Sequence, residues 1–132
     1  MIRRVILASA VLPFLAAAVS GQAPSKTTND GVYTAAQAER GKKAFTTSCT
    51  TCHDNDRFSG ASFADAWTGK PLKEIWDVAS GTMPEDNPGS LKQQEYADII
   101  AYFLSLNQYP AGDAELAPGA VPMGMIKVEK KK

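Results

Sequence analysis

The 132-residue sequence contains only two cysteines and one histidine, and all three lie within residues 49–53. A structural zinc site needs four ligands, so zinc would have to recruit a carboxylate such as Asp54 or Asp56, which is an uncommon set. A disulfide between Cys49 and Cys52 would close too small a loop to stabilise much. Cysteine is therefore too scarce for a disulfide framework or an ordinary zinc-clamped domain.

The sequence also lacks an excess of positive or negative charge, and it lacks strand patterns. Lys and Arg together number 14, as do Asp and Glu, so the formal net charge is zero and nothing supports nucleic-acid binding. The three lysines that close the chain fit a solvated tail. No segment alternates apolar and polar residues as a half-buried strand does, which predicts an all-α domain.

The first 23 residues predict an export signal that is cleaved from the mature protein. Two arginines open this segment, an apolar core of about 15 residues follows, and Gly21 and Ala23 are the small residues that a signal peptidase accepts. The apolar run is shorter than the roughly 20 residues of a membrane-spanning helix, and Pro13 interrupts it. We predict cleavage after Gly21 or Ala23, a bacterial periplasmic or secreted location, and no stable membrane anchor.

The run Cys49-Thr50-Thr51-Cys52-His53 predicts covalent attachment of a haem. Two thiols at this spacing lie about one helical turn apart, so each can form a thioether with one of the two porphyrin vinyl groups. The following histidine can then offer its neutral imidazole to the iron. We predict one covalently bound haem c, attached through Cys49 and Cys52, with His53 as an axial ligand of the metal.

A polar leader, residues 24–33, precedes an amphipathic helix that runs into this motif. Thr34 and Gln37 form a capping-box pattern at its start, and Gly41 and Phe45 lie on its apolar face. Glycine inside a helix costs about 1 kcal/mol relative to alanine. We therefore expect another helix to approach closely at Gly41.

A second long helix is predicted from Leu91 to Leu106, with a Ser-x-x-Gln capping pattern at its start and a broad apolar face. We expect it to cross the first helix at Gly41, with Ile99 or Tyr102 at the crossing. A short middle helix is predicted to begin at Pro71.

The length of the mature chain indicates one domain, residues 34–108. Residues 109–132 contain several prolines and glycines and predict an extended tail that lies over the surface or is disordered.

These features together resemble those of class I cytochromes c. In the order of that family, the matching features are Gly41 and Phe45, the haem motif, the Thr82-Met83-Pro84 loop and residues 99–103 in the final helix. A looser likeness, in residues 67–70, 88–89 and 95–98, is to small bacterial cytochromes associated with quinoprotein dehydrogenases. The resemblance implies a small all-α fold in which the N- and C-terminal helices cross and short middle helices surround one haem.

The resemblance also implies a second axial ligand. In such proteins a methionine on the loop before the last helix binds the iron, and Met83 occupies that position. A thioether is a weak, soft ligand that favours ferrous iron, and a filled sixth position keeps oxygen and peroxide away. Met123 and Met125 lie in the tail, flank Gly124 and are far from any predicted helix, so they are poorer candidates.

The sequence therefore predicts a soluble, exported electron-transfer protein rather than an enzyme, shuttling one electron between a dehydrogenase or membrane complex and a later acceptor. Its partners are expected to be redox proteins: a quinoprotein dehydrogenase, a membrane complex or an oxidase. Two alternatives stay open. One is a haem enzyme or gas sensor with an open sixth site. The other is a periplasmic thiol-disulfide oxidoreductase with a reactive Cys49, although that class expects a strand before the first cysteine and residues 35–40 favour a helix.

Overall fold

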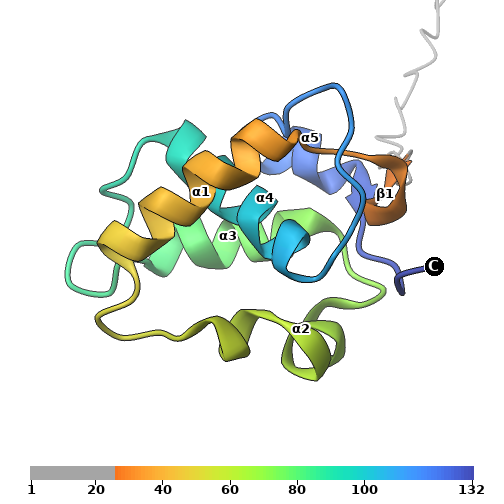
Figure 1. Ribbon diagram of the computed structural model, residues 1–132. Helices are drawn as coiled ribbons and strands as arrows, with labels where there is room; N and C mark the ends of the chain where they lie inside the picture. Colours follow the sequence, from red (N-terminus) through yellow and green to blue (C-terminus); the bar gives the residue numbers. More distant parts are fainter. Residues whose placement is uncertain (1–25) are drawn as a thin grey trace, which may run out of the picture.

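The computed structural model describes residues 26–132, and within them the fold is helical with very little strand (Figure 1). The elements in chain order are β1 Lys26–Thr27, the 3-10 helix η1 Thr28–Asp30, α1 Ala35–Ser48, the 3-10 helix η2 Asn55–Phe58, α2 Gly60–Trp67, α3 Leu72–Thr82, α4 Gln93–Leu106, α5 Ala120–Gly124 and β2 Ile126–Lys127. The prediction of a small all-α fold is confirmed. The predicted export signal, residues 1–23, lies outside the described residues. Within residues 26–132, no helix is both long and apolar enough to span a membrane.

The starts of the two long helices test the predicted caps. At α1 the hydroxyl of Thr34 accepts a hydrogen bond from the backbone N–H of Gln37 at 3.1 Å, as the capping pattern predicted. Helix α4 begins at Gln93 instead of Leu91, because the side chain of Glu95 accepts a hydrogen bond from the backbone N–H of Lys92 at 2.8 Å and fixes the start there. The predicted serine cap was therefore wrong by two residues.

Helices α1 and α4 cross at Gly41, as predicted. A Cβ atom at this position would lie 1.8 Å from the carbonyl oxygen of Asp98 and 2.9 Å from the backbone nitrogen of Ile99. Only glycine allows the two backbones to come so close. Tyr102 lies further along α4, where its ring packs against Phe45 with 5.7 Å between ring centroids.

A buried carboxylate joins the two helices beside this crossing. Asp98 is only 5% exposed, yet its oxygens accept hydrogen bonds from Gln37 Nε2 at 3.1 Å, Gln94 Nε2 at 2.8 Å and Arg40 Nε at 2.9 Å. Hydrogen bonds to Asp98 and to Glu115 raise the pKa of the Arg40 guanidinium. The charge of Asp98 is thus fully paired, which a buried carboxylate requires.

Residues 109–132 differ from the expectation of an extended or disordered tail. They form α5 and β2, and their side chains Leu116, Met123 and Val128 are 2% exposed or less. Strand β2 pairs in parallel with β1 and ties the tail to the start of the described chain. The tail therefore completes the hydrophobic core. Its apolar residues are too widely spaced among prolines and glycines to give a periodic signal, so the sequence pattern does not show this.

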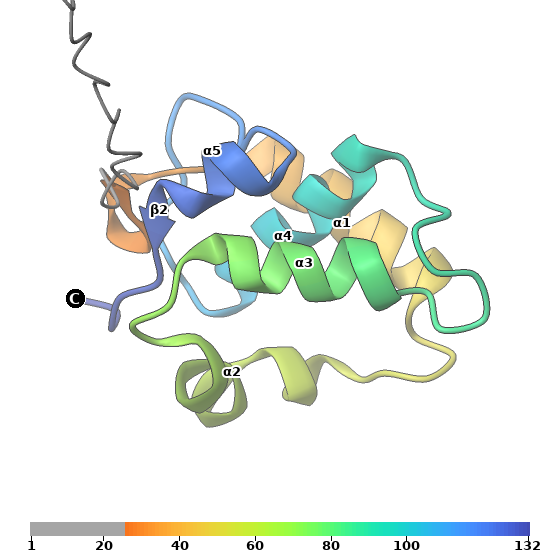
Figure 2. The same cartoon turned by 180° about the vertical axis from the view of Figure 1, so that it is seen from behind.

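The middle helices lie on two sides of the molecule. Helix α3 packs against both α4 and α5. Figures 1 and 2 show α2 and η2 on the opposite side of α3 from α5, joined to the rest by extended connections. The segment that follows the haem motif therefore runs along one edge of the helical layer.

Candidate functional site

The haem motif forms a single turn that continues α1. The backbone N–H of Cys49 donates to the carbonyl of Phe45 at 2.8 Å, and the N–H groups of Cys52 and His53 both donate to the carbonyl of Cys49, at 3.1 and 2.9 Å. This winding brings both thiols and the imidazole to the same end of α1. Neither thiol is in a disulfide; Cys49 is half-buried and Cys52 is exposed.

The environment of Cys49 disfavours thiol-disulfide chemistry. Its side chain packs against the hydrophobic core, and burial raises the pKa of the thiol. Reactive cysteines need the opposite shift, because the thiolate is the nucleophile. The residues before Cys49 also form a helix, not the strand of a thioredoxin-like site. Both observations argue against a redox-active dithiol at this position.

His53 lies against an aromatic wall. Its half-buried ring meets Phe58 edge to face, with 5.5 Å between centroids, and Phe58 stacks on Phe103 of α4 with 4.4 Å between centroids. The sequence reasoning did not assign Phe58 or Phe103 to the site. The signal that could have identified the site is the aromatic residue Phe58, which ends the short 3-10 helix η2 that follows His53.

Two polar side chains at the C-terminal end of α4 hold residues 55–60 in place. Asn107 donates from Nδ2 to the carbonyl of Phe58 at 2.8 Å and accepts at Oδ1 from the N–H of Gly60 at 2.9 Å. The hydroxyl of Tyr102 donates to Asn55 Oδ1 at 3.1 Å. The sequence pattern predicted that the last helix ends at Leu106 and assigned Asn107 no role in the site.

Met83 is held between two helices. It is the C-cap of α3, where its backbone N–H donates to the carbonyl of Ala79 at 3.2 Å, and its own carbonyl accepts a hydrogen bond from the hydroxyl of Tyr96 on α4 at 2.7 Å. Tyr96 and Phe103 lie on the same helix, about 10 Å apart at its usual rise. The segments that carry His53 and Met83 are therefore both anchored on α4.

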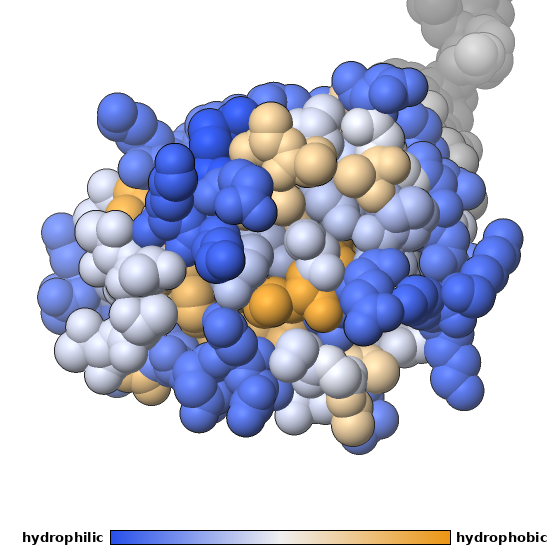
Figure 3. Space-filling view, viewed as in Figure 1, coloured by the Kyte–Doolittle hydropathy of each residue, from blue (hydrophilic) through white to orange (hydrophobic). Residues whose placement is uncertain are grey.

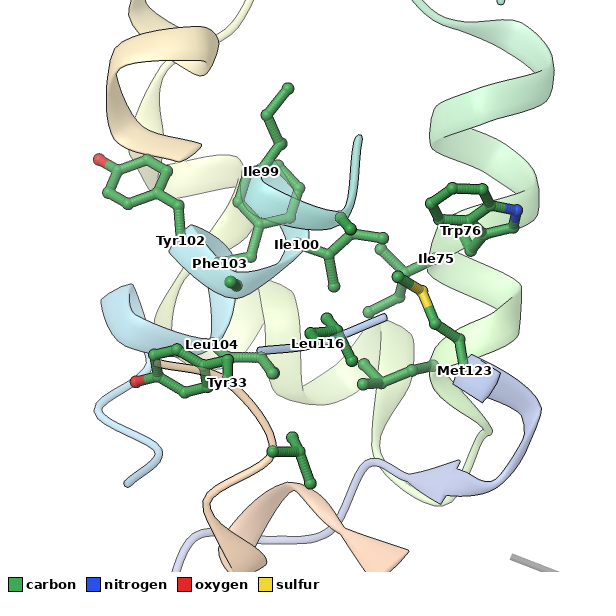
Figure 4. Close-up of a cluster of buried hydrophobic side chains, with 14 of the residues drawn as sticks. Tyr33, Ile75, Trp76, Ile99, Ile100, Tyr102, Phe103, Leu104, Leu116 and Met123 are labelled. Carbon is green, nitrogen blue, oxygen red and sulfur yellow. The ribbon is translucent and has the colours of Figure 1, made fainter. Parts of the chain in front are cut away.

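The other two candidate methionines lie elsewhere. Met123 is fully buried, and Figure 4 shows it among Ile75 and Leu116 in the core. Its neighbour Gly124 lies beside Lys73, at the beginning of α3, whereas Met83 follows the end of that helix, roughly 15 Å further along. Met125 is half-buried, and its carbonyl accepts the N–H of Lys26 at the tail sheet.

The donors at this site fit a haem. In the part of the chain that the structure describes, no three His, Cys, Asp or Glu side chains are grouped to hold a metal ion. Two thiols, one imidazole and one thioether instead match a cofactor that supplies most of the iron's ligands itself and needs thioether attachment. Figure 3 shows hydrophobic residues exposed along the middle of one face, between the α1 and α4 side and α2. Two surface hollows lie elsewhere, against the tail, and neither is lined by His53 or Met83.

Comparison with known proteins agrees with this site. A family model described as cytochrome c oxidase, cbb3-type, subunit III matches residues 36–103, which include the haem motif, Met83 and most of α4. Searches of curated proteins and of solved structures found no match. The matched model covers just over half of the chain, and a c-type cytochrome domain carries covalently bound haem c. The chain therefore belongs to the cbb3-type cytochrome c oxidase subunit III family and is a c-type cytochrome with one haem-binding motif.

Proposed function

We propose that this protein is an exported carrier of single electrons, in which His53 and Met83 are the axial ligands of a haem c bound through Cys49 and Cys52. The observation that carries this proposal is the attachment of the Met83 backbone to both α3 and α4, the helix that also supports the His53 segment. When bound, the haem supplies reversible one-electron chemistry between ferric and ferrous iron.

The protein's own side chains favour electron transfer over oxygen chemistry. The thioether of Met83 is a soft ligand and stabilises the reduced state, and with both axial positions filled no small molecule can bind without displacing it. Phe58 covers part of the His53 imidazole with apolar surface, and Phe103 stacks behind Phe58. The protein thus holds both ligands while it donates or accepts an electron, which is the behaviour of a carrier and not of an enzyme.

The sequence and the matched family support a location and a class of partner. The charged start and apolar core of residues 1–23 support export to the periplasm or beyond. The description of the family names a cytochrome oxidase, which supports an oxidase or another membrane complex as electron acceptor, with a dehydrogenase as donor. Residues 50–52 and 85–90, beside the two ligand segments, are exposed and leave surface for a small, brief interface. The likeness to cytochromes of quinoprotein dehydrogenases stays a prediction.

Optical spectroscopy of the exported, purified protein tests the axial ligands. We expect a covalent haem spectrum in the oxidised and reduced states, with the weak sulfur-to-iron charge-transfer band in the far red of the ferric protein. Met83→Ala should abolish that band and let the ferrous protein bind carbon monoxide. Met125→Ala is the matched control, because it removes a half-buried thioether from the tail sheet and should leave the band in place.

Each contrary result points to one of the alternatives. A wild-type haem spectrum without the sulfur band, with ready binding of carbon monoxide, would overturn the carrier in favour of a haem enzyme or gas sensor. Absence of covalent haem would overturn the carrier in favour of a thiol-disulfide oxidoreductase. The intact mass of the same preparation reports both the attached haem and the cleavage position, after Gly21 or after Ala23.

A further inference from the structure

The loop that carries Met83 is fastened to the helical layer by one side chain. The hydroxyl of Tyr96 donates to the carbonyl of Met83 at 2.7 Å and accepts from the backbone N–H of Leu91 at 3.3 Å. Among the described residues, no other side-chain hydrogen bond joins residues 83–91 to the rest of the chain. The backbone N–H of Gly89 also donates to the carbonyl of Met83, at 3.2 Å, but this bond lies within the loop. The Tyr96 hydroxyl is therefore the side-chain group that ties both ends of the loop to α4.

Tyr96 is itself rigidly held. It is 1% exposed, it lies in the first turns of α4, and its ring meets the buried indole of Trp76 edge to face with 6.2 Å between centroids. The hydroxyl is thus presented from a packed helix, whereas residues 85–90 are exposed and are joined mainly by turn hydrogen bonds within the loop. The packed helix therefore determines where the exposed loop lies.

We propose that Tyr96 is the positioning residue that keeps Met83 available to the iron, an inference that rests on Met83 being the axial ligand. A methionine side chain has three rotatable bonds and binds iron weakly, so it competes poorly with external ligands when its backbone moves. Here α3 fixes the Met83 N–H through Ala79, and Tyr96 fixes its carbonyl. Removal of the hydroxyl leaves the carbonyl bonded to the N–H of Gly89, a residue of the same loop, and no longer to α4, while α3 still holds the N–H of Met83.

Tyr96→Phe tests this role, because it removes the hydroxyl and keeps the packed ring. In the purified holoprotein we expect a weaker sulfur-to-iron band and about tenfold tighter binding of carbon monoxide to the ferrous form, the effect of one lost hydrogen bond on the ligand-bound state. Tyr33→Phe is the matched control. It also removes a buried hydroxyl that donates to a backbone carbonyl at 2.7 Å, that of Tyr109, but on the tail side of the molecule. We expect it to leave the band and carbon monoxide affinity unchanged.

The outcomes separate this inference from the proposed function. A wild-type protein that lacks the sulfur band overturns Met83 ligation itself. A wild-type protein with the band, combined with a Tyr96→Phe variant that matches it in band and carbon monoxide affinity, overturns only the role of Tyr96. Equal changes in both tyrosine variants would also overturn it, since they would reflect general loosening. Amide exchange gives a check that needs no variant: the N–H of Leu91 should exchange slowly in the wild-type protein, and exchange at the rate of a free amide would overturn the anchor.

Discussion

Helix α4 serves two regions of the molecule that are built differently. Where it meets α1, the backbones touch at Gly41 and the carboxylate of Asp98 is paired on every side. Where it meets the two ligand segments, contact depends on a few long side chains, chiefly Tyr96, Tyr102 and Asn107, that reach across to half-exposed loops. We call these two regions the crossing region and the ligand region.

The difference shows where stability and function lie in a small haem protein. The crossing region and the tail bury their apolar groups with polypeptide alone, so they are expected to supply most of the free energy of unfolding. The ligand region leaves His53 and Met83 half-buried, so that the cofactor can contribute the missing apolar contacts. Substitutions in the first region should therefore act on stability, and those in the second mainly on ligation.

The largest effect is expected from Gly41→Ala in the crossing region. The added methyl would lie 1.8 Å from the carbonyl oxygen of Asp98, and backbone atoms cannot swing aside, so the helices must separate. We expect a loss of about 4 kcal/mol or more in the free energy of unfolding of the holoprotein, measured by chemical denaturation.

Gly81→Ala is the matched control for that experiment. Gly81 also lies inside a helix, α3, but a Cβ there would meet nothing within 4 Å. Alanine is the better helix former, so the control should be neutral or stabilise by up to about 1 kcal/mol. Similar losses of unfolding free energy in both variants would contradict the close contact of α1 and α4 at Gly41.

A somewhat smaller effect is expected from Met123→Ala in the tail. This side chain is completely buried, so its truncation leaves a cavity and should cost about 3 kcal/mol in the same denaturation experiment. Val121→Ala, on the same short helix, removes methyl groups from a residue that is 81% exposed and should change stability by less than about 0.5 kcal/mol. If the two variants behave alike, the tail lies over the surface, as the sequence pattern suggested, and does not belong with the crossing region.

The sequence predicted the crossing region well because its cause is local. A glycine in the middle of a helical pattern is costly, so Gly41 already indicated a close neighbour. The spacing of Cys49, Cys52 and His53 is likewise determined by the porphyrin that it must match. It can be recognised without knowledge of the surrounding elements. Such features can be read from one chain segment at a time.

The tail and the supports of the ligand region depend on partners that are distant in the sequence. Leu116 is fixed by a hydrogen bond from its N–H to Gln37 Oε1 at 2.7 Å, across 79 positions of sequence. The apolar residues around it follow neither a helical nor a strand period, so nothing local indicates their burial. Tyr96 and Asn107 likewise read as ordinary helix positions until the loops that they bind have been placed.

The smallest effect we predict compares one chemical change on the tail side of the molecule and in the ligand region. Tyr33→Phe removes the donor to the buried carbonyl of Tyr109 and leaves that oxygen without a partner, which should cost about 2 kcal/mol. Tyr102→Phe removes the donor to Asn55, whose exposed side chain can bond to water instead, so the loss should stay below about 1 kcal/mol.

The two tyrosine variants are compared by denaturation of the holoproteins side by side. A larger loss for Tyr102→Phe than for Tyr33→Phe would mean that the ligand region carries more of the stability than its exposure indicates. The expected order follows from what each hydroxyl leaves behind: a buried acceptor in the tail and a solvated amide beside the haem motif. Hydrogen bonds of the ligand region then act mainly on where the ligand segments lie, while a similar bond on the tail side stabilises the folded state.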